Sequence, residues 1–477
     1  MRAALAVLLV VLGTATIGHA QTQTQTPTPT QPPPSTTPQA PTPAPPPTTQ
    51  PPAQTPTPQM PAPTQTPTGI PTSRPITLDE AIAIALEGQP DIQARMADYR
   101  ALRFRVDQAL APLLPQLTGT STTTRSSQTI LPQTATATQT VVVQRDFNQT
   151  FSAQVGVSQV LFDFGKNFAA IDVARKNADV GLEQIELQRQ TITQTVKESY
   201  TTMNFNRRLI RVNEQALQRA ELNLRSARGF FEVGTRPKSD VTRAEVDVAN
   251  ANVDLIRARN AERLARVLLN TSMGIPADTP TQVIDNLAYT PVTVDRAKLQ
   301  QDALRQRPEY RQSRLRVEGA DAFVRQRFRE FFPDITGQAA YGGFQTDLKE
   351  SWSATLNFTW PLFDGGGRIA RFREARASLE SARATLRSQA LSIERDVEQQ
   401  IIAVIEAQER IQAAGKAVES AQENFRLAQG RFDAGVGTIL ELTDAQLALT
   451  QAQNTEAQAL QDFQVNLARL DRAVGRR

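Results

Sequence analysis

Residues 397–432 read VEQQIIAVIEAQERIQAAGKAVESAQENFRLAQGRF, and this stretch decides the fold. Large apolar residues recur in it at every seventh position: Val397, Val404, Ile411, Val418, Phe425 and Phe432. An alanine stands three residues after four of them: Ala407, Ala414, Ala421 and Ala428. A strict seven-residue spacing predicts a long helix in left-handed coiled-coil packing, and the alanines let a neighbouring helix approach closely.

The same spacing occurs earlier in the chain, at Val196, Met203, Ile210, Leu217, Leu224 and Phe231. The helix predicted around these residues runs from about Gly165 to Phe231. At 1.5 Å per residue, its roughly 67 residues would span on the order of 100 Å. A globular domain does not hold a helix of that length, so the sequence predicts a rod-like assembly.

The chain aligns with itself, which predicts two repeats at 76–276 and 277–477. Pro115-Gln116-Leu117-Thr118-Gly119 matches Pro333-Asp334-Ile335-Thr336-Gly337, and Leu161-Phe162-Asp163 matches Leu362-Phe363-Asp364. Each half is expected to contain a helix, two strands, a very long helix, a sharp turn and a returning helix. The first helix should begin at Thr77, which forms a capping box with Glu80, and end near Pro112. Its partner is expected from about Asp295 to Phe332.

Two strand-like segments precede each long helix, at about 116–127 and 150–162 and then at 334–344 and 351–362. In the last of them apolar and polar residues alternate, and one face carries Trp352, Leu356, Phe358 and Trp360. Eleven residues with a period of two suit a transmembrane β-strand with a lipid face and a water face. The alternative is a half-buried strand in a soluble sheet. Because four strands cannot close a barrel and an open edge is untenable in lipid, several chains would have to share one barrel.

The first residues have the features of a secreted chain. Met1-Arg2, the apolar run from Ala3 to Leu12 and the small residues Gly18 and Ala20 predict a signal peptide over 1–20. Residues 21–75 are almost entirely Thr, Gln, Pro and Ala, which predicts a disordered linker.

Composition excludes several classes of function. The chain has no Cys, and its one His, His19, lies in the predicted signal peptide. Thiolate, imidazole and Ser-His-Asp chemistry are therefore not expected in the mature protein. The formal net charge of +4 is too balanced for a nucleic-acid binder. Since the sequence contains no catalytic or metal-binding motif, we expect neither an enzyme nor a cofactor.

The repeated order of elements resembles the TolC-like outer-membrane efflux protein family. So do the Pro-x-Leu/Ile-x-Gly motif, the Leu-Phe-Asp motif and the glycine-containing turns near Phe231 and Phe432. The resemblance implies a mainly α fold with a membrane β-barrel: a homotrimer whose chains each give four strands to a twelve-stranded barrel above a long coiled-coil tunnel. It also implies a location in the Gram-negative outer membrane, with the helices in the periplasm. The expected partners are a periplasmic adaptor protein, an inner-membrane pump and outer-membrane lipid.

The resemblance further assigns roles to residues at the two helix turns. Gly234, Thr235 and Arg236 of the first turn, and Gly435, Gly437 and Thr438 of the second, would meet the adaptor. Glu441 and Asp444 would ring the inner end of the tunnel as a gate, with Asp240 as a further candidate. The alternative is that these are ordinary acids in the first turn of a helix, stabilised by its dipole.

One departure concerns the second turn: a member of the family that this chain resembles has an arginine there that helps to lock the closed state, and this sequence has Gly437. Asp240 would then lack its partner unless Arg236 or Arg243 substitutes.

Two functions follow from these observations. The first is an exit duct that conducts substrates passively from a pump across the outer membrane. The second is a secreted coiled-coil protein with a structural or adhesive role, which would not need the strand pairs. Drug efflux, metal efflux and protein secretion all remain open for the duct.

Overall fold

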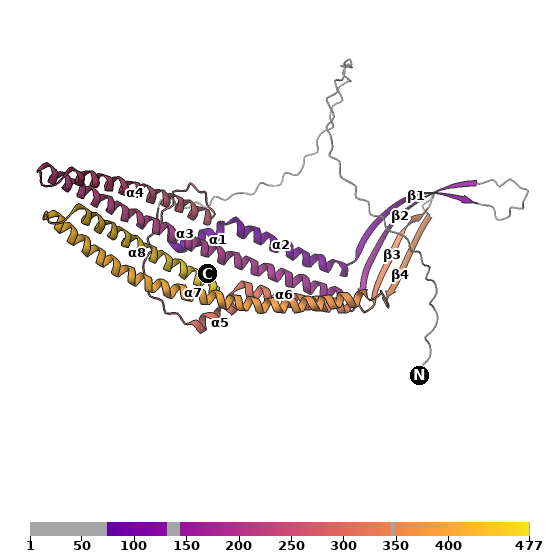
Figure 1. Ribbon diagram of the computed structural model, residues 1–477. Coiled ribbons are helices and arrows are strands. Elements are labelled where there is room, and N and C mark those ends of the chain that lie inside the picture. The colour runs from indigo at the N-terminus through magenta and orange to yellow at the C-terminus, as the bar shows by residue number, and fades with distance from the viewer. Residues whose placement is uncertain (1–73, 131–143, 345–348, 477) are drawn as a thin grey trace, which may run out of the picture. The chain divides into compact units, whose positions relative to one another are not determined.

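A computed structural model describes residues 74–130, 144–344 and 349–476 (Figure 1). The predicted signal peptide, 1–20, and all but the last two residues of the predicted linker, 21–75, lie outside the described residues. The elements come in two runs of the same order, each with two shorter helices, two strands, one very long helix and a returning helix. This is the order expected from the sequence, and the predominance of helix is confirmed.

The shorter helices differ from the prediction because each is divided in two by a proline. In the first half α1 (Leu78–Gly88) and α2 (Pro90–Leu110) are separated by Gln89, which is extended, and the 3-10 turn η1 (Ala111–Leu113) follows α2. In the second half Arg307 separates α5 (Arg296–Gln306) from α6 (Pro308–Arg329) in the same way. A residue that precedes proline avoids the helical conformation, so a single helix over 77–112 or 295–332 was wrong. The capping box of Thr77 and Glu80 is present.

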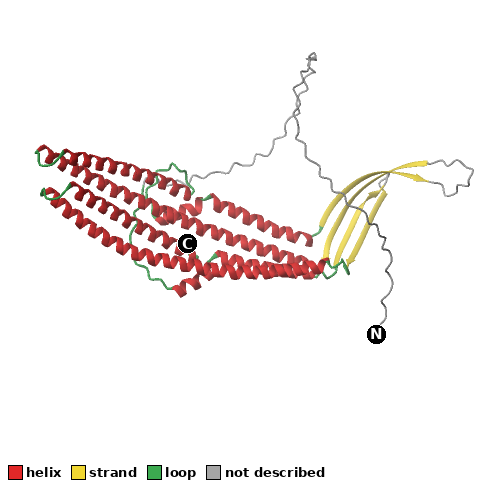
Figure 2. Ribbon diagram, in the orientation of Figure 1, coloured by secondary structure: helices red, strands yellow, loops and turns green. Residues whose placement is uncertain are grey.

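The four strands form one antiparallel sheet in the order β1 (Gln116–Ile130), β2 (Gln144–Phe162), β3 (Asp334–Phe344) and β4 (Lys349–Thr359) (Figure 2). β1 and β2 run further than the predicted 116–127 and 150–162, and β3 matches 334–344. β4 ends before the predicted Leu362, since Pro361 has no N–H for the ladder. Within one chain, β1 and β4 are left as edge strands.

The long helices α3 (Lys166–Glu232) and α7 (Gly367–Asp433) have 67 residues each. Each starts directly after a strand pair and ends in a turn to a returning helix, α4 (Lys238–Ser272) or α8 (Ile439–Val474). At 1.5 Å per residue, either long helix spans about 100 Å. Each long helix therefore has the sheet at one end and the turn to its returning helix at the other.

Each half has its own apolar core, placed where the short helices pack on the long one. Val196 in α3 and Val397 in α7 are fully buried at equivalent positions of the seven-residue repeat, and so are Ile401 and Val404. Ile210, Leu217 and Leu224, further toward the turn, are only half-buried. The heptad residues thus fill a core near the short helices and form a thinner seam toward the turns.

The two halves are joined mainly through α3, which packs against α6 and α8 of the second half as well as against α2 and α4 of its own. In one such contact Lys176 of α3 donates a hydrogen bond to Glu318 of α6 at 2.6 Å, and this bond lowers the pKa of the Glu318 carboxyl. Among the described residues, no helix is both long enough and apolar enough to span a membrane.

Candidate functional site

The first helix turn, between α3 and α4, contains Gly234, Thr235 and Arg236. Gly234 has a φ of +72°, and a Cβ added there would have open space around it, so the glycine is needed for the backbone conformation rather than for space. Thr235 donates from both its N–H and its hydroxyl to the carbonyl oxygen of Phe230, at 3.0 and 2.8 Å. Gly234 and Thr235 are exposed, whereas Arg236 is not.

The second turn, between α7 and α8, is built around Gly435 and Gly437. Gly435 has a φ of +77° and matches Gly234. Gly437 is buried and donates its N–H to the carbonyl oxygen of Arg431 at 2.8 Å. A Cβ there would lie 2.9 Å from the Cβ of Arg431, so only glycine fits. Thr438 caps α8, its hydroxyl accepting from the N–H of Glu441 at 3.2 Å.

Arg236 connects the two turns. Its guanidinium donates to the carbonyl oxygen of Gly437 at 2.5 Å and lies 4.5 Å from the centroid of the Phe432 ring. The same guanidinium is 3.5 Å from a carboxylate oxygen of Asp240, and the two side chains are only 13% and 16% exposed. The structure thus gives Asp240 the arginine partner that Gly437 cannot supply, and that partner comes from its own turn.

The acidic residues at the start of α8 have different surroundings from Asp240. Glu441 is 49% exposed and lies 3.6 Å from the guanidinium of Arg431. Asp444 is exposed one turn further along. Between them in the sequence, the hydroxyl of Thr443 donates to the carboxylate of Asp247 on α4 at 2.9 Å. This hydrogen bond is a second contact between the helix pair α3–α4 and the helix pair α7–α8. Two carboxylates at the turn end of α8 therefore face solvent in a single chain.

The sheet has one apolar and one polar face. Directly opposed residues share a face, and the register places Val155 opposite Tyr341 and Tyr341 opposite Trp352. Eight large side chains of this face are exposed: Leu117, Phe151, Val155, Val157, Tyr341, Trp352, Leu356 and Phe358. Trp360, just beyond β4, is exposed and donates its indole N–H to the carbonyl oxygen of Phe331 at 3.3 Å.

Polar and small residues form the other face of the sheet: Thr118, Thr120, Thr122, Gln154, Ser158, Gln338, Thr355 and Asn357. Space on this face is tight at Gly342, where a Cβ would come within 2.3 Å of the carbonyl oxygen of Ala153. β2, β3 and β4 therefore carry apolar residues on one face and polar or small residues on the other, whereas β1 is polar or small on both faces between Leu117 and Ile130.

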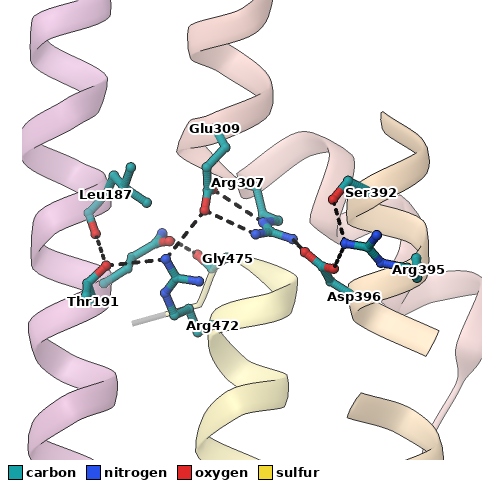
Figure 3. A network of polar contacts seen from close by, with 10 residues as sticks. Leu187, Thr191, Arg307, Glu309, Ser392, Arg395, Asp396, Arg472 and Gly475 are labelled. Carbon is teal, nitrogen blue, oxygen red and sulfur yellow. Dashed lines mark hydrogen bonds and ion pairs between the residues drawn. The ribbon is translucent and has the colours of Figure 1, made fainter. Parts of the chain in front are cut away.

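A buried ionic cluster lies at the junction of α5 and α6, with partners on α3, α7 and α8 (Figure 3). Arg307, whose side chain is 6% exposed, donates to both carboxylate oxygens of Glu309, at 3.3 and 3.1 Å, and to Asp396 of α7 at 3.3 Å. Arg472 of α8 lies 3.6 Å from Glu309 and donates to the hydroxyl of Thr191 on α3 at 3.3 Å. This cluster ties the second half to α3.

Sequence reasoning missed the ionic cluster of Arg307, to which it assigned no role. It did offer Arg236 as a substitute partner for Asp240, which the structure confirms, but not its contacts with the second turn. It also missed Val233 and Val436, apolar residues that are each 72% exposed at the two turns. Their place beside the turn glycines is the signal that could have found them. Among the described residues, no group of three or more His, Cys, Asp or Glu side chains could hold a metal ion.

The chain matches the sequence model of the family described as outer membrane efflux protein over residues 81–275 and 299–476. It is 24% identical over 392 residues to the probable efflux pump outer membrane protein TtgC of Pseudomonas putida, covering 79% of this chain and 78% of that protein. It is 25% identical over 406 residues to the alkaline protease secretion protein AprF of Pseudomonas aeruginosa, covering 81% and 82%.

Solved structures have the same fold. The outer membrane protein VceC of Vibrio cholerae superimposes with a TM-score of 0.71 at 21% identity, covering 83% of this chain and 96% of that one. Proteins of the matched family are trimeric outer-membrane channels that work with periplasmic adaptors and inner-membrane pumps. The secreted coiled-coil alternative does not account for a match that includes the strand pairs. With both halves of the chain matched, this protein belongs to the outer membrane efflux protein family.

Proposed function

We propose that three copies of the chain close a single twelve-stranded barrel and form, with their long helices, the tunnel of an outer-membrane exit duct. The observation that carries this proposal is the two-faced sheet, with exposed large apolar side chains on one side and hydroxyl and amide groups on the other. Such alternation suits strands with one face toward lipid and one toward a water-filled lumen.

The open edges of the sheet support the same arrangement. β1 and β4 have no neighbour on their outer sides within one chain. Unpaired backbone groups are costly in lipid, where no water satisfies them, and closure is the arrangement that removes both edges. Trp352, Leu356, Phe358 and Trp360 are the side chains that we propose to face lipid.

Matched substitutions on neighbouring residues of β4 test this proposal. Leu356→Arg places a charge on the apolar face and should reduce insertion strongly, since an arginine on the lipid face costs about 2–4 kcal/mol at the bilayer midplane. Thr355→Arg places the same charge on the polar face and should still insert. The readout is the number of channels formed in a planar lipid bilayer per amount of folded protein. Equal insertion by both variants, or no conductance from the unmodified protein, would contradict the proposal.

For the gate we propose Glu441 and Asp444, which three chains would repeat around the turn end of the tunnel. Rings of carboxylates attract cations and set barriers in narrow pores. Both side chains are exposed in the single chain and are thus free to face a lumen. Asp240 has a different role in this proposal, because its carboxylate is held beside Arg236 and buried between the turns.

The turns themselves are the proposed contact with the adaptor protein. Gly234, Thr235, Gly435 and Thr438 are exposed, and Val233 and Val436 add apolar surface beside them. Val436→Asp should abolish export by the assembled pump while leaving the conductance of the isolated channel unchanged. A passive role without catalysis accords with membership of the family. Such a role does not require the thiolate or imidazole chemistry that the composition excludes.

A further inference from the structure

The first turns of α7 are far more basic than those of α3, although the two helices are equivalent in the repeat. Residues 367–387 contain six arginines and two glutamates: Arg368, Arg371, Arg373, Glu374, Arg376, Glu380, Arg383 and Arg387. The equivalent residues of α3, 166–186, contain three basic and four acidic side chains. The formal charges are therefore +4 and −1, and the fold alone does not require the excess of arginine on α7.

Only the first two of these arginines have ionic partners within the chain. Arg368 lies 3.2 Å from Asp364, and Arg371 lies 3.4 Å from Glu330 and 3.6 Å from Asp364. In the part of the chain that the structure describes, the others have no ion-pair partner, and all are exposed: Arg373, Arg376, Arg383 and Arg387. Their guanidinium groups are available to an anionic partner outside the chain.

A set of aromatic rings begins on the apolar face of the sheet, next to α7. Phe162 lies opposite Ile335, which lies opposite Phe358, so all three side chains are on the apolar face. The ring of Phe164, just after β2, lies 4.7 Å from that of Phe162 and 5.3 Å from that of Phe332, measured between centroids. The set thus leads from the sheet to the end of α6.

The aromatic set continues from α6 to α7, which run side by side to the sheet (Figure 1). The ring of Phe328 lies 5.7 Å from that of Phe332 and 6.0 Å from that of Phe372 on α7. The guanidinium of Arg376 lies over the Phe372 ring, 6.0 Å from its centroid. Contiguous rings therefore connect the face that we propose to contact lipid with one of the unpaired arginines.

The aromatic set also gives the level of the membrane surface on the proposed barrel, because aromatic side chains collect where the hydrocarbon core meets water. Arg373 and Arg376 lie about 9 and 14 Å along α7 from its start. A headgroup layer is roughly 5–8 Å thick, and the long stem of an arginine lets its charge reach toward it. Arg383 and Arg387 lie about 10–16 Å further along than Arg376, beyond a Debye length at physiological salt.

We infer that Arg373 and Arg376 bind the phosphate groups of anionic phospholipids at the periplasmic surface of the outer membrane. A guanidinium matches phosphate oxygens with two parallel hydrogen bonds, and basic residues beside a membrane are attracted to anionic lipids. This inference rests on the proposed barrel and adds a headgroup preference, which an apolar sheet face does not supply.

The surface that carries these two arginines stays accessible when other helices lie beside α7. α3 packs against both α2 and α6. Even so, the side chains of Asp172 and Arg175, the repeat counterparts of Arg373 and Arg376, are 50% and 65% exposed. Asp172 would repel the phosphate that Arg373 attracts, so the first half of the chain does not offer the same site.

The two tryptophans of the chain provide a reporter at each end of β4. Trp360 donates its indole N–H to the carbonyl oxygen of Phe331, whose ring lies 6.3 Å from that of Phe372. Trp352 lies opposite Tyr341, roughly 26 Å away along the strand. Phospholipids with brominated acyl chains quench tryptophan fluorescence on contact. Trp352→Phe therefore leaves a reporter beside the arginines, and Trp360→Phe leaves one at the other end of the sheet.

The experiment compares brominated phosphatidylglycerol with brominated phosphatidylethanolamine, each titrated into phosphatidylcholine bilayers that hold the full-length protein. We expect Trp360 to be quenched at a several-fold lower fraction of phosphatidylglycerol, with a weaker preference in high salt. Trp352 should show no preference.

Two matched double variants test the residues. Arg373→Gln with Arg376→Gln should abolish the preference at Trp360. Arg383→Gln with Arg387→Gln removes the same charge further from the membrane and should keep it. Quenching of Trp352 in both double variants, with Trp360→Phe, shows that each is inserted in the bilayer.

Equal quenching of Trp360 by the two lipids would overturn the inference and leave the proposed duct standing. So would a preference that survives Arg373→Gln with Arg376→Gln, or one that both double variants lose to the same extent. If no brominated lipid quenches either tryptophan, the apolar face of the sheet does not meet lipid, and both this inference and the proposed barrel are wrong.

Discussion

The two helix turns are equivalent in the repeat, yet they are built differently. Arg236 of the first turn corresponds to Gly437 of the second, and the arginine donates its hydrogen bond to the carbonyl oxygen of that very glycine. Phe231 is 43% exposed, whereas its counterpart Phe432 is completely buried against Phe230 and Arg236. Asp240 is paired and largely buried, whereas its counterpart Glu441 is half exposed.

The repeat explains why the two halves have the same order of helices and strands. The residues that differ between the halves explain why the two turns are built differently. Arg236 of the first turn contacts Gly437 and Phe432 of the second turn. Glu441 and Asp444, after the second turn, are exposed, as the proposed gate lining requires.

The same contrast occurs at the junctions between the short helices. Gly274 and Gly475 end equivalent helices, and each packs closely against the extended residue before a proline. In the first half that residue is Gln89, which donates to the carbonyl oxygen of Ser272 at 3.4 Å. In the second half it is Arg307, at the centre of an ionic cluster. The second junction holds the halves together, and the first is a local contact.

Of the differences between equivalent positions, the largest is expected in the free energy of unfolding when these two junctions are mutated. Arg307→Met leaves Glu309 with only Arg472, and Asp396 with only Arg395, as ionic partners. Removing one member of a buried ion pair costs about 3–5 kcal/mol. Gln89→Met removes one long hydrogen bond and should cost about 1 kcal/mol or less. Denaturant unfolding of the two purified variants measures both values. Equal losses would mean that the cluster does not hold the halves together.

The aromatic residues at the turns come next. Phe432→Ala removes a fully buried ring and should destabilise the protein by about 3 kcal/mol. Phe231→Ala, at the equivalent exposed position, should change stability by only about 0.5 kcal/mol, as surface substitutions generally do. Thermal unfolding followed by circular dichroism provides the comparison. A loss from Phe231→Ala as large as that from Phe432→Ala would refute the proposed asymmetry of the turns.

A smaller effect is expected on ion binding at the gate. Glu441→Gln with Asp444→Asn should raise conductance and weaken block by multivalent cations on the order of tenfold, since each carboxylate contributes about 1–4 kcal/mol to a cation within 4 Å. The control is Glu232→Gln with Asp433→Asn, which removes the same charge from the ends of α3 and α7. Single-channel recordings with added trivalent cation measure the block. Unchanged block in the first variant would remove Glu441 and Asp444 from the gate.

Loss of the contacts that Arg236 makes between the turns should have a still smaller effect, which is expected in the resting conductance. Arg236→Met removes the ion pair with Asp240 within the first turn and two contacts between the turns, the hydrogen bond to Gly437 and the cation–π contact with Phe432. The two contacts between the turns are together worth roughly 1 kcal/mol, or about fivefold in the equilibrium between the closed and open channel. The resting conductance should rise, whereas Arg243→Met at an exposed neighbouring site should leave it unchanged. If both variants conduct like the unmodified channel, the contacts of Arg236 between the turns do not help to hold the channel closed.

The smallest effect concerns Lys176 and Glu318, whose repeat counterparts, Ala377 and Arg100, cannot form an ion pair. Because the hydrogen bond from Lys176 lowers the pKa of Glu318, the pair stabilises the fold above the pKa of the unfolded carboxyl and loses that effect as the pH falls. Both side chains are about one-third exposed, so Lys176→Met should cost less than about 1 kcal/mol at neutral pH. The difference from the unmodified protein should vanish in acid unfolding curves.

Much of this structure could be predicted from local patterns. The seven-residue spacing predicted the long helices to within a few residues, alternation predicted most of β4, and β3 matches the segment expected beside it. The breaks at Gln89 and Arg307 could have been found from the prolines that follow them. The link from Arg236 to Gly437 could not, because it joins residues 201 positions apart through a contact that departs from the repeat.

The particle formed by the full-length chain tests the central claim most directly. The protein would be expressed, extracted from the outer membrane in mild detergent, and measured for mass and length. We expect a trimer at least on the order of 130 Å long, from the length of the helices plus the thickness of the barrel. A monomer or dimer with no membrane fraction would contradict the account, because nothing else closes the edges of the sheet.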